Sequence, residues 1–167
     1  RIAVLAVSDT RSLAKDKSGD ALVARISQAG HKLAVRHILR DNREDIAAQL
    51  RAWVEDPEID VILSTGGTGL TGRDVTVEAH REVYEKEIDA FGTVFTMVSM
   101  QKIGTSAVQS RATGGVAGGT YLFALPGSSG ACKDAWDEIL KWQFDYRHRP
   151  CNFVEILPRL DEHLRRK

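Results

Sequence analysis

The sequence predicts a single α/β domain of three layers, in which helices flank both faces of a mostly parallel sheet. Short apolar segments of strand length alternate along the chain with segments whose apolar residues recur at helical spacing. The first segment, residues 2–7, is apolar throughout, which is typical of a parallel strand buried on both faces. The 167 residues suit one domain, and no repeat or linker divides them. Such alternation is typical of right-handed βαβ crossovers.

Each segment of the first half fits this alternation. After the strand over residues 2–7, a helix is predicted over residues 20–29 because Leu22 and Ile26 share one face, and Gly30 is placed to end it. The remaining segments of this half are a strand over 33–39, a helix over 42–54 with Ile46, Leu50 and Trp53 as its apolar stripe, and a strand over 61–63.

The second half contains the longest predicted helix, residues 88–103. Phe91 and Phe95 lie on one face of it, whereas Met97 and Met100 lie on the opposite side. A helix with two apolar faces often packs against another subunit, so we expect an interface here; the alternative is that the methionines fill surface gaps. The other predicted elements are a helix over 76–84, a turn at Gly114-Gly115, a strand over 121–125, a helix over 131–144 and a polar tail from about residue 158 that forms a short charged helix.

Composition and charge narrow the classes of function. Lys plus Arg and Asp plus Glu each number 23, so the net charge is zero and gives no support to binding of nucleic acid or acidic membranes. Cys132, Cys151 and five dispersed histidines show neither zinc-site spacing nor a nucleophile signature. Because no apolar run is long enough to span a membrane, we expect a cytoplasmic protein. Strand-like sequence follows Arg1 at once, so we also expect residues to precede it.

Three loops are predicted to meet at the carboxyl edge of the sheet, where parallel α/β proteins bind their ligands. They follow the first three strands and span residues 8–11, 40–41 and 64–74. Each contains an aspartate, and we expect Asp9, Asp41 and Asp74 to converge although they are far apart in sequence.

The longest of these loops begins Ser64-Thr65-Gly66-Gly67-Thr68-Gly69 and is suited to binding a phosphate. Glycines leave backbone N–H groups uncovered, and the helix that follows adds the positive end of its dipole. Gly67 and Gly72 have the spacing of a P-loop, but Arg73 and Asp74 stand where Lys and Ser or Thr are required. An ordinary nucleoside-triphosphatase loop is therefore excluded, and so is a GxGxxG dinucleotide fingerprint.

Asp41 and Asp74 have two interpretations. Asp41 with Glu44 three residues later fits a variant of the helix capping box, which spacing alone favours, and Asp74 is placed to cap the helix that starts near Thr76. Alternatively, the two carboxylates hold Mg²⁺, an ion usually bound by one or two carboxylates together with substrate phosphates. The ion would then neutralise charge on a transferring phosphoryl group.

Two further segments are placed to contact a ligand. Leu125-Pro126-Gly127-Ser128-Ser129-Gly130 joins a strand to a helix and is either part of the site or only a tight connection. Ser110-Arg111 precedes the predicted glycine turn, and its guanidinium is a candidate partner for an anion.

The residues of the glycine loop, continued by Gly72-Arg73-Asp74-Val75-Thr76, resemble the signature of the molybdopterin-binding family. Later motifs resemble its MoaB branch, which is close to the MogA adenylyltransferases, and the resemblance covers essentially the whole chain. These motifs are Phe91-Gly92, Ile103-Gly104-Thr105-Ser106, Gln109-Ser110-Arg111-Ala112, Phe123-Ala124-Leu125-Pro126-Gly127-Ser128 and Arg149-Pro150-Cys151-Asn152-Phe153.

The resemblance implies a Rossmann-like molybdopterin-binding domain over residues 1–167 that acts in molybdenum cofactor biosynthesis. Family enzymes transfer AMP from Mg-ATP to the terminal phosphate of molybdopterin before molybdenum is inserted. Asp41 and Asp74 match the two acidic positions that matter in active relatives. Some MoaB proteins lack the first acid, so its presence here favours an active enzyme.

The resemblance also implies roles for the remaining residues and an assembly state. Asp41 and Asp74 are expected to be catalytic and to bind Mg²⁺; Thr65, Gly66, Gly67, Thr68, Gly69, Ser110 and Arg111 to bind the pterin phosphate; and Ser8, Pro126, Gly127 and Ser128 to line ATP. Members form homotrimers or homohexamers. Two alternative functions remain: a non-catalytic molybdopterin-binding or scaffold protein, and a nucleotide hydrolase related to the competence/damage-inducible family, whose chains are much longer.

Overall fold

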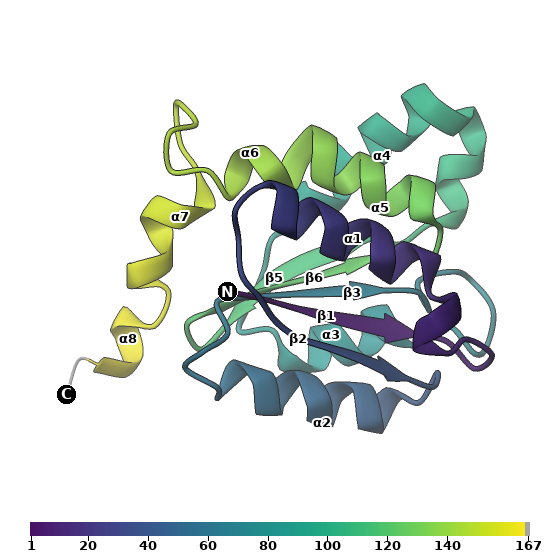
Figure 1. Ribbon diagram of the computed structural model, residues 1–167, viewed down its shortest axis with the longest axis horizontal. Helices are drawn as coiled ribbons and strands as arrows, with labels where there is room; N and C mark the ends of the chain where they lie inside the picture. Colours follow the sequence, from purple (N-terminus) through teal and green to yellow (C-terminus); the bar gives the residue numbers. More distant parts are fainter. Residues whose placement is uncertain (166–167) are drawn as a thin grey trace.

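A computed structural model describes residues 1–165 and contains a six-stranded sheet between two layers of helices (Figure 1). The strand order across the sheet is β2-β1-β3-β6-β5-β4, and the first four of these strands are parallel. The predicted α/β fold class is thereby confirmed. The strands are β1 (Ile2–Val7), β2 (Leu33–Leu39), β3 (Val61–Thr65), β4 (Lys86–Glu87), β5 (Thr113–Ala117) and β6 (Thr120–Leu125).

Two hydrophobic cores form because helices cover both faces of the sheet. Successive side chains of a strand point to opposite faces. Val4 therefore packs beneath Leu22 of α1, whereas Leu5 packs with Leu50 of α2 on the other face. This arrangement explains why β1 is apolar at every position. The helices are α1 (Lys17–Gln28), α2 (Arg43–Val54), α3 (Thr76–Val83), α4 (Asp89–Ile103), α5 (Ser129–Ala135), α6 (Lys141–Gln143), α7 (Phe153–Ile156) and α8 (Glu162–Arg165), with short helical turns η1 (Leu13–Lys15), η2 (Gly104–Gln109), η3 (Trp136–Leu140) and η4 (Leu157–Arg159).

The predicted turn at Gly114-Gly115 is wrong, because both glycines lie inside strand β5. This strand runs antiparallel to β6. Its glycines leave room for aromatic rings: a Cβ on Gly114 would lie 2.7 Å from the Phe123 ring, and one on Gly115 would lie 2.4 Å from the Tyr84 ring. Because these rings pack directly on the backbone, β5 has glycines at positions where apolar side chains would normally indicate a strand.

Three other elements differ from the prediction by two residues or more at a boundary. Helix α1 begins earlier, at Lys17, because the Asp16 carboxylate accepts a hydrogen bond from the Gly19 N–H at 3.0 Å and caps the helix there. Strand β3 continues to Thr65. The single helix predicted over residues 131–144 begins at Ser129 and consists of α5, the π-helical turn η3 and α6 in succession.

Helix α4 has the two apolar faces that were predicted. Phe91 and Phe95 are buried against the sheet, whereas Met97 is 62% exposed and Met100 is 44% exposed. The side of α4 that faces away from the core thus presents apolar side chains to the surface, and its role as a subunit interface stays a prediction.

The predicted polar tail is described as far as residue 165, and its last two residues lie outside the described part of the chain. It contains the short charged helix α8. No helix within residues 1–165 combines the length and the apolar character that crossing a bilayer requires.

Candidate active site

A cavity of about 440 Å³ opens at the carboxyl ends of β1, β3 and β6. Its lining includes residues from all three predicted loops, namely Ser8, Asp41, Gly66 to Gly69 and Asp74, together with Ser110 and the Pro126-Gly127-Ser128 turn. The strand order explains this convergence, because β1 lies beside β3, and β3 lies beside β6. Residues more than a hundred positions apart in the chain are thereby placed around one volume.

The glycine loop can take its conformation only with glycine at two positions. Gly66 and Gly67 have φ angles of 100° and 67°, which residues with a side chain rarely adopt. A Cβ on Gly66 would also lie 2.2 Å from the Val7 carbonyl oxygen, and one on Gly67 would lie 2.8 Å from Oδ1 of Asp41. The loop backbone therefore approaches both β1 and the Asp41 carboxylate closely.

The start of the loop is held by buried hydrogen bonds. Ser64 Oγ lies 2.8 Å from Nε2 of His80, whose burial lowers its pKa to about 3 and keeps it neutral. The Thr65 hydroxyl donates to the Pro126 carbonyl at 3.0 Å and so ties the end of β3 to the end of β6. Thr65 is 1% exposed and does not line the cavity. The side chain positions the loop, and its predicted contact with a phosphate stays a prediction.

Three carboxylates lie close together, and two of them, Asp41 and Asp74, line the cavity. Asp9 accepts two hydrogen bonds of 2.9 Å from the Arg73 guanidinium, which lowers its pKa, and a third from the Asp41 backbone N–H. Burial raises the pKa of Asp41, and the negative charges of Asp9 and Asp74 raise it further. The convergence of Asp9, Asp41 and Asp74 predicted from the sequence is therefore present.

The capping roles considered for Asp41 and Asp74 are wrong. Helix α2 is capped by Asn42, whose side-chain oxygen accepts the Asp45 N–H at 3.0 Å. Helix α3 has no side-chain cap, and the Asp74 carboxylate instead accepts the backbone N–H and the hydroxyl of Thr71 at 2.9 and 2.8 Å. Neither carboxylate caps the start of a helix, and both line the cavity.

Arg111 braces the glycine loop from behind. Its Nε donates to the carbonyl oxygen of Gly69 at 2.9 Å, its Nη2 donates to that of Asp74 at 3.3 Å, and its guanidinium pairs with Glu78 of α3. The cavity lining contains Ser110 but not Arg111. In the structure Arg111 orients the carbonyl groups of the loop, and its predicted contact with a phosphate stays a prediction.

Ser110 and Ser8 bring hydroxyl groups to the cavity. Within residues 1–165, no group makes a hydrogen bond with the buried Ser110 Oγ, which leaves the hydroxyl available to a ligand. Ser8 Oγ accepts the backbone N–H groups of Thr10 and Arg11 at 3.3 and 3.2 Å, and its own proton remains for donation. Its first task is to shape the loop after β1.

Sequence reasoning missed three residues that line the cavity: Val7, Arg11 and Gln109. Arg11 belongs to the loop after β1, so its position at the carboxyl edge of the sheet was a usable signal. What the sequence did not indicate is which way its long side chain points.

The donor groups fit Mg²⁺. Within residues 1–165, no three His, Cys, Asp or Glu side chains are arranged to hold a metal ion by themselves. Asp41 and Asp74 nevertheless supply hard carboxylate oxygens beside one cavity. Mg²⁺ is usually held in this way, with waters and substrate phosphates as its remaining ligands.

Comparison with known proteins adds an independent observation. Residues 3–145 match the model of a family described as "Probable molybdopterin binding domain". Over 153 residues the chain is 46% identical to molybdenum cofactor biosynthesis protein B of Escherichia coli strain K12, covering 92% of this chain and 90% of that protein.

Solved structures of proteins from this pathway have a similar fold. A crystal structure of a molybdenum cofactor biosynthesis protein B superposes with a TM-score of 0.82 at 36% identity, covering 99% of this chain and 96% of the other. The tungsten cofactor synthesizing protein MoaB from Pyrococcus furiosus superposes with a TM-score of 0.79 at 30% identity, with 96% of each chain covered.

Proposed function

The chain belongs to the molybdopterin-binding domain family and has a role in molybdenum cofactor biosynthesis, and we propose that it catalyses the Mg-ATP-dependent adenylylation of molybdopterin. The observation that carries this proposal is the meeting of two carboxylates, Asp41 and Asp74, with the glycine loop around one cavity. Phosphate groups need uncovered N–H donors, and a divalent cation needs carboxylate oxygens. The glycine loop and the two carboxylates line the same volume.

The reaction forms a phosphoanhydride. An oxygen of the terminal molybdopterin phosphate attacks the α-phosphorus of ATP, and the bond from this phosphorus to the α–β bridging oxygen breaks. Pyrophosphate leaves with the electron pair of that bond, and no proton needs to be removed from a dianionic attacking phosphate. The barrier arises mainly from bringing like charges together, which positioning and electrostatic stabilisation can lower.

Residues of the chain divide this task. Asp41 and Asp74 would hold Mg²⁺, which when bound would supply positive charge to the phosphates. The backbone N–H groups of the glycine loop and the Ser110 hydroxyl would bind the pterin phosphate. The Pro126-Gly127-Ser128 turn, together with Ser8, would lie against the nucleotide, and Arg111 would keep the loop in its binding conformation.

The test is an assay of the purified protein with molybdopterin and Mg-ATP, in which adenylylated molybdopterin and pyrophosphate are quantified by chromatography. We expect Asp41→Asn and Asp74→Asn each to lower the turnover rate by about a hundredfold or more, since each removes charge from the metal site. The exposed Asp45→Asn on α2 serves as the matched control and should retain the wild-type rate.

Each other result has a definite meaning. Turnover that is unchanged in both site variants would disprove the metal assignment. Binding of molybdopterin in calorimetry without an ATP-dependent product would indicate a non-catalytic binding or scaffold protein. Release of AMP or ADP without any transfer to the pterin would indicate a nucleotide hydrolase.

We further propose that the chain assembles as a homotrimer or homohexamer through α4 and η2. Met97, Ile103 and Val108 of this segment are 62%, 56% and 73% exposed, which gives it an apolar surface suited to a second copy. Light scattering should report a mass that is a multiple of three chains, and Met97→Glu should lower it. A stable monomer at micromolar concentration would refute the assembly.

A further inference from the structure

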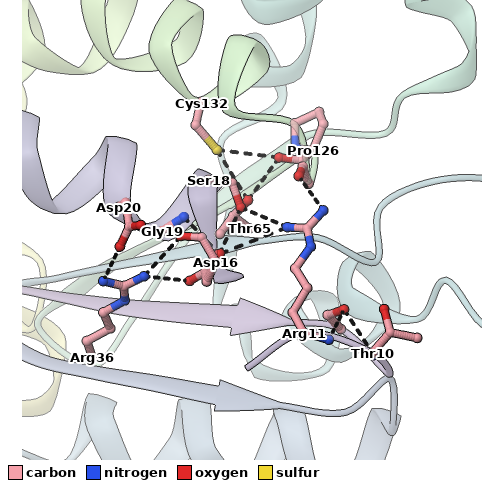
Figure 2. A network of polar contacts seen from close by, with 12 residues as sticks. Thr10, Arg11, Asp16, Ser18, Gly19, Asp20, Arg36, Thr65, Pro126 and Cys132 are labelled. Carbon is pink, nitrogen blue, oxygen red and sulfur yellow. Dashed lines mark hydrogen bonds and ion pairs between the residues drawn. The ribbon is translucent and has the colours of Figure 1, made fainter. Parts of the chain in front are cut away.

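Arg11 lines the cavity, and its guanidinium is held by two hydrogen bonds (Figure 2). Its Nη1 donates to the Ser18 hydroxyl at 3.1 Å, and its Nη2 donates to the Gly127 carbonyl at 2.9 Å. In Figure 2 the side chain extends from the loop after β1 to reach Ser18 and the turn that begins at Pro126. Two elements that are distant in sequence therefore orient this cation.

The positive charge of Arg11 is only partly compensated by its neighbours. Asp16 is fully buried, and Arg36 pairs with it at 2.9 Å and also with Asp20 at 2.7 Å. Arg11 forms a longer ion pair with Asp16, at 3.9 Å, which is too long for a hydrogen bond. A guanidinium carries five N–H donors, and its contacts with Ser18 and Gly127 leave others for a ligand.

Charges are ordered along the glycine loop. A Cβ on Gly127 would lie 3.1 Å from Cα of Gly66 and 3.7 Å from Nη2 of Arg11, so the arginine stands at the Gly66 end. A Cβ on Gly69 would lie 2.7 Å from Oδ2 of Asp74, and Asp41 approaches Gly67 in between. Gly66 thus lies near the Arg11 cation, whereas Gly67 and Gly69 lie near carboxylates.

We propose that Arg11 forms a phosphate subsite that needs no metal ion, at the Gly66–Gly127 end of the cavity, and that this subsite takes the phosphate of a nucleoside monophosphate unit. A phosphate placed here meets the guanidinium directly. One placed beside Asp41 and Asp74 is repelled until a divalent cation intervenes. The choice of a nucleotide rests on the proposed function, because Gly127 belongs to the turn assigned to ATP.

The experiment is a calorimetric titration of the full chain with AMP in the presence of EDTA. Wild-type protein should bind AMP without Mg²⁺. Arg11→Ala should weaken this binding about tenfold or more, because a charge-assisted hydrogen bond is worth about 1.5–3 kcal/mol and 1.4 kcal/mol is a factor of ten. Arg11→Lys should fall between the two, since it keeps the charge but loses the planar fork.

Two further variants separate this subsite from the metal site. Asp41→Asn should bind AMP in EDTA as well as the wild type or more tightly, because it removes a repelling charge. Arg51→Ala removes an exposed arginine of α2 that pairs with Glu82 at 3.9 Å, and it should leave AMP binding unchanged. If Arg11→Ala unfolds, Ser18→Ala replaces it: loss of the hydroxyl that orients Arg11 should weaken AMP binding about twofold to fivefold.

The inference is overturned if wild-type protein binds AMP only when Mg²⁺ is added, or if folded Arg11→Ala binds AMP in EDTA like the wild type. Its outcome can be distinguished from that of the proposed function. Arg11-dependent AMP binding without any adenylylated product would support the subsite and refute the transferase. Formation of adenylylated molybdopterin, together with AMP binding that does not depend on Arg11, would support the transferase and refute the subsite.

Discussion

Replacement of the buried Asp16 by alanine is expected to destabilise the fold strongly. The Asp16 carboxylate is 0% exposed and accepts hydrogen bonds from the Gly19 N–H at 3.0 Å, the Ser18 hydroxyl at 3.2 Å and Arg36 Nη2 at 2.9 Å. It is at once the cap of α1 and the counter-ion that joins α1 to β2 (Figure 2). Asp16→Ala removes both functions.

The magnitude follows from these two losses. An Asp cap replaced by alanine costs about 1 kcal/mol. Breaking a buried ion pair by removing one partner costs about 3–5 kcal/mol, and the lower end applies because Arg36 is 19% exposed and keeps its contact with Asp20. The sum is about 4 kcal/mol, a large part of the total stability of about 5–15 kcal/mol that is usual for a domain.

The assay is urea unfolding followed by circular dichroism, repeated at two protein concentrations so that dissociation of an assembly is seen. With an m-value of about 2 kcal/mol/M, the midpoint should fall by about 2 M. Asp16→Asn keeps a capping oxygen and should recover about 1 kcal/mol, and Asp20→Ala, at a 60% exposed carboxylate, should cost less than about 1 kcal/mol. A loss below about 1 kcal/mol in Asp16→Ala would refute the reasoning.

Three more predictions concern the core and the site. Gly66→Ala should destabilise by about 2–4 kcal/mol in urea unfolding, because φ is 100° and the Cβ would lie 2.2 Å from the Val7 carbonyl oxygen; Gly130→Ala, with no atom within 4 Å, should instead stabilise α5 by about 0.5–1 kcal/mol. Burial lowers the pKa of His80 from 6.5 to about 3, so only the unfolded chain takes up this proton below pH 6.5; as the pH falls from 6 to 4, the free energy of unfolding should drop by about 1.4 kcal/mol per unit more in the wild type than in His80→Gln. Because the pKa of Asp41 is raised in the fold, its ionised form destabilises the folded protein. Asp41→Asn should therefore raise the melting temperature at pH 7, and this gain should disappear as the pH falls below the ordinary pKa of 3.8. An equal or lower melting temperature at pH 7 would contradict this.

The sequence predicted the parallel part of the fold because this part is encoded locally. Strands β1 and β2 appear at the predicted residues. Strand β1 is apolar throughout because helices cover both of its faces, whereas β2 lies at the edge of the sheet and includes Arg36 and His37. Strand β5 was missed because its glycines are dictated by the rings of Phe123 and Tyr84, which lie elsewhere in the chain.

The site was predictable to the extent that it follows from topology. The carboxyl ends of neighbouring strands must meet, so Asp9, Asp41 and Asp74 could be brought together without coordinates. The directions of long side chains could not be predicted, because they depend on the groups that pair with each side chain in the fold. Arg111 points to the back of the glycine loop, where Glu78 pairs with it, and Arg11 points into the cavity, where the Gly127 carbonyl accepts its hydrogen bond.

The position of β6 beside β3 has a consequence for biosynthesis of the chain. All three aspartates lie within the first 74 residues, yet the Gly66 N–H donates to the Leu125 carbonyl at 3.0 Å, and Thr65 donates to Pro126. The ribosome must therefore release the segment up to residue 126 before the acidic half of the site gains its lasting shape. A nascent chain that is arrested before that point carries all three aspartates but lacks the residues of β6 and its following turn that complete the cavity.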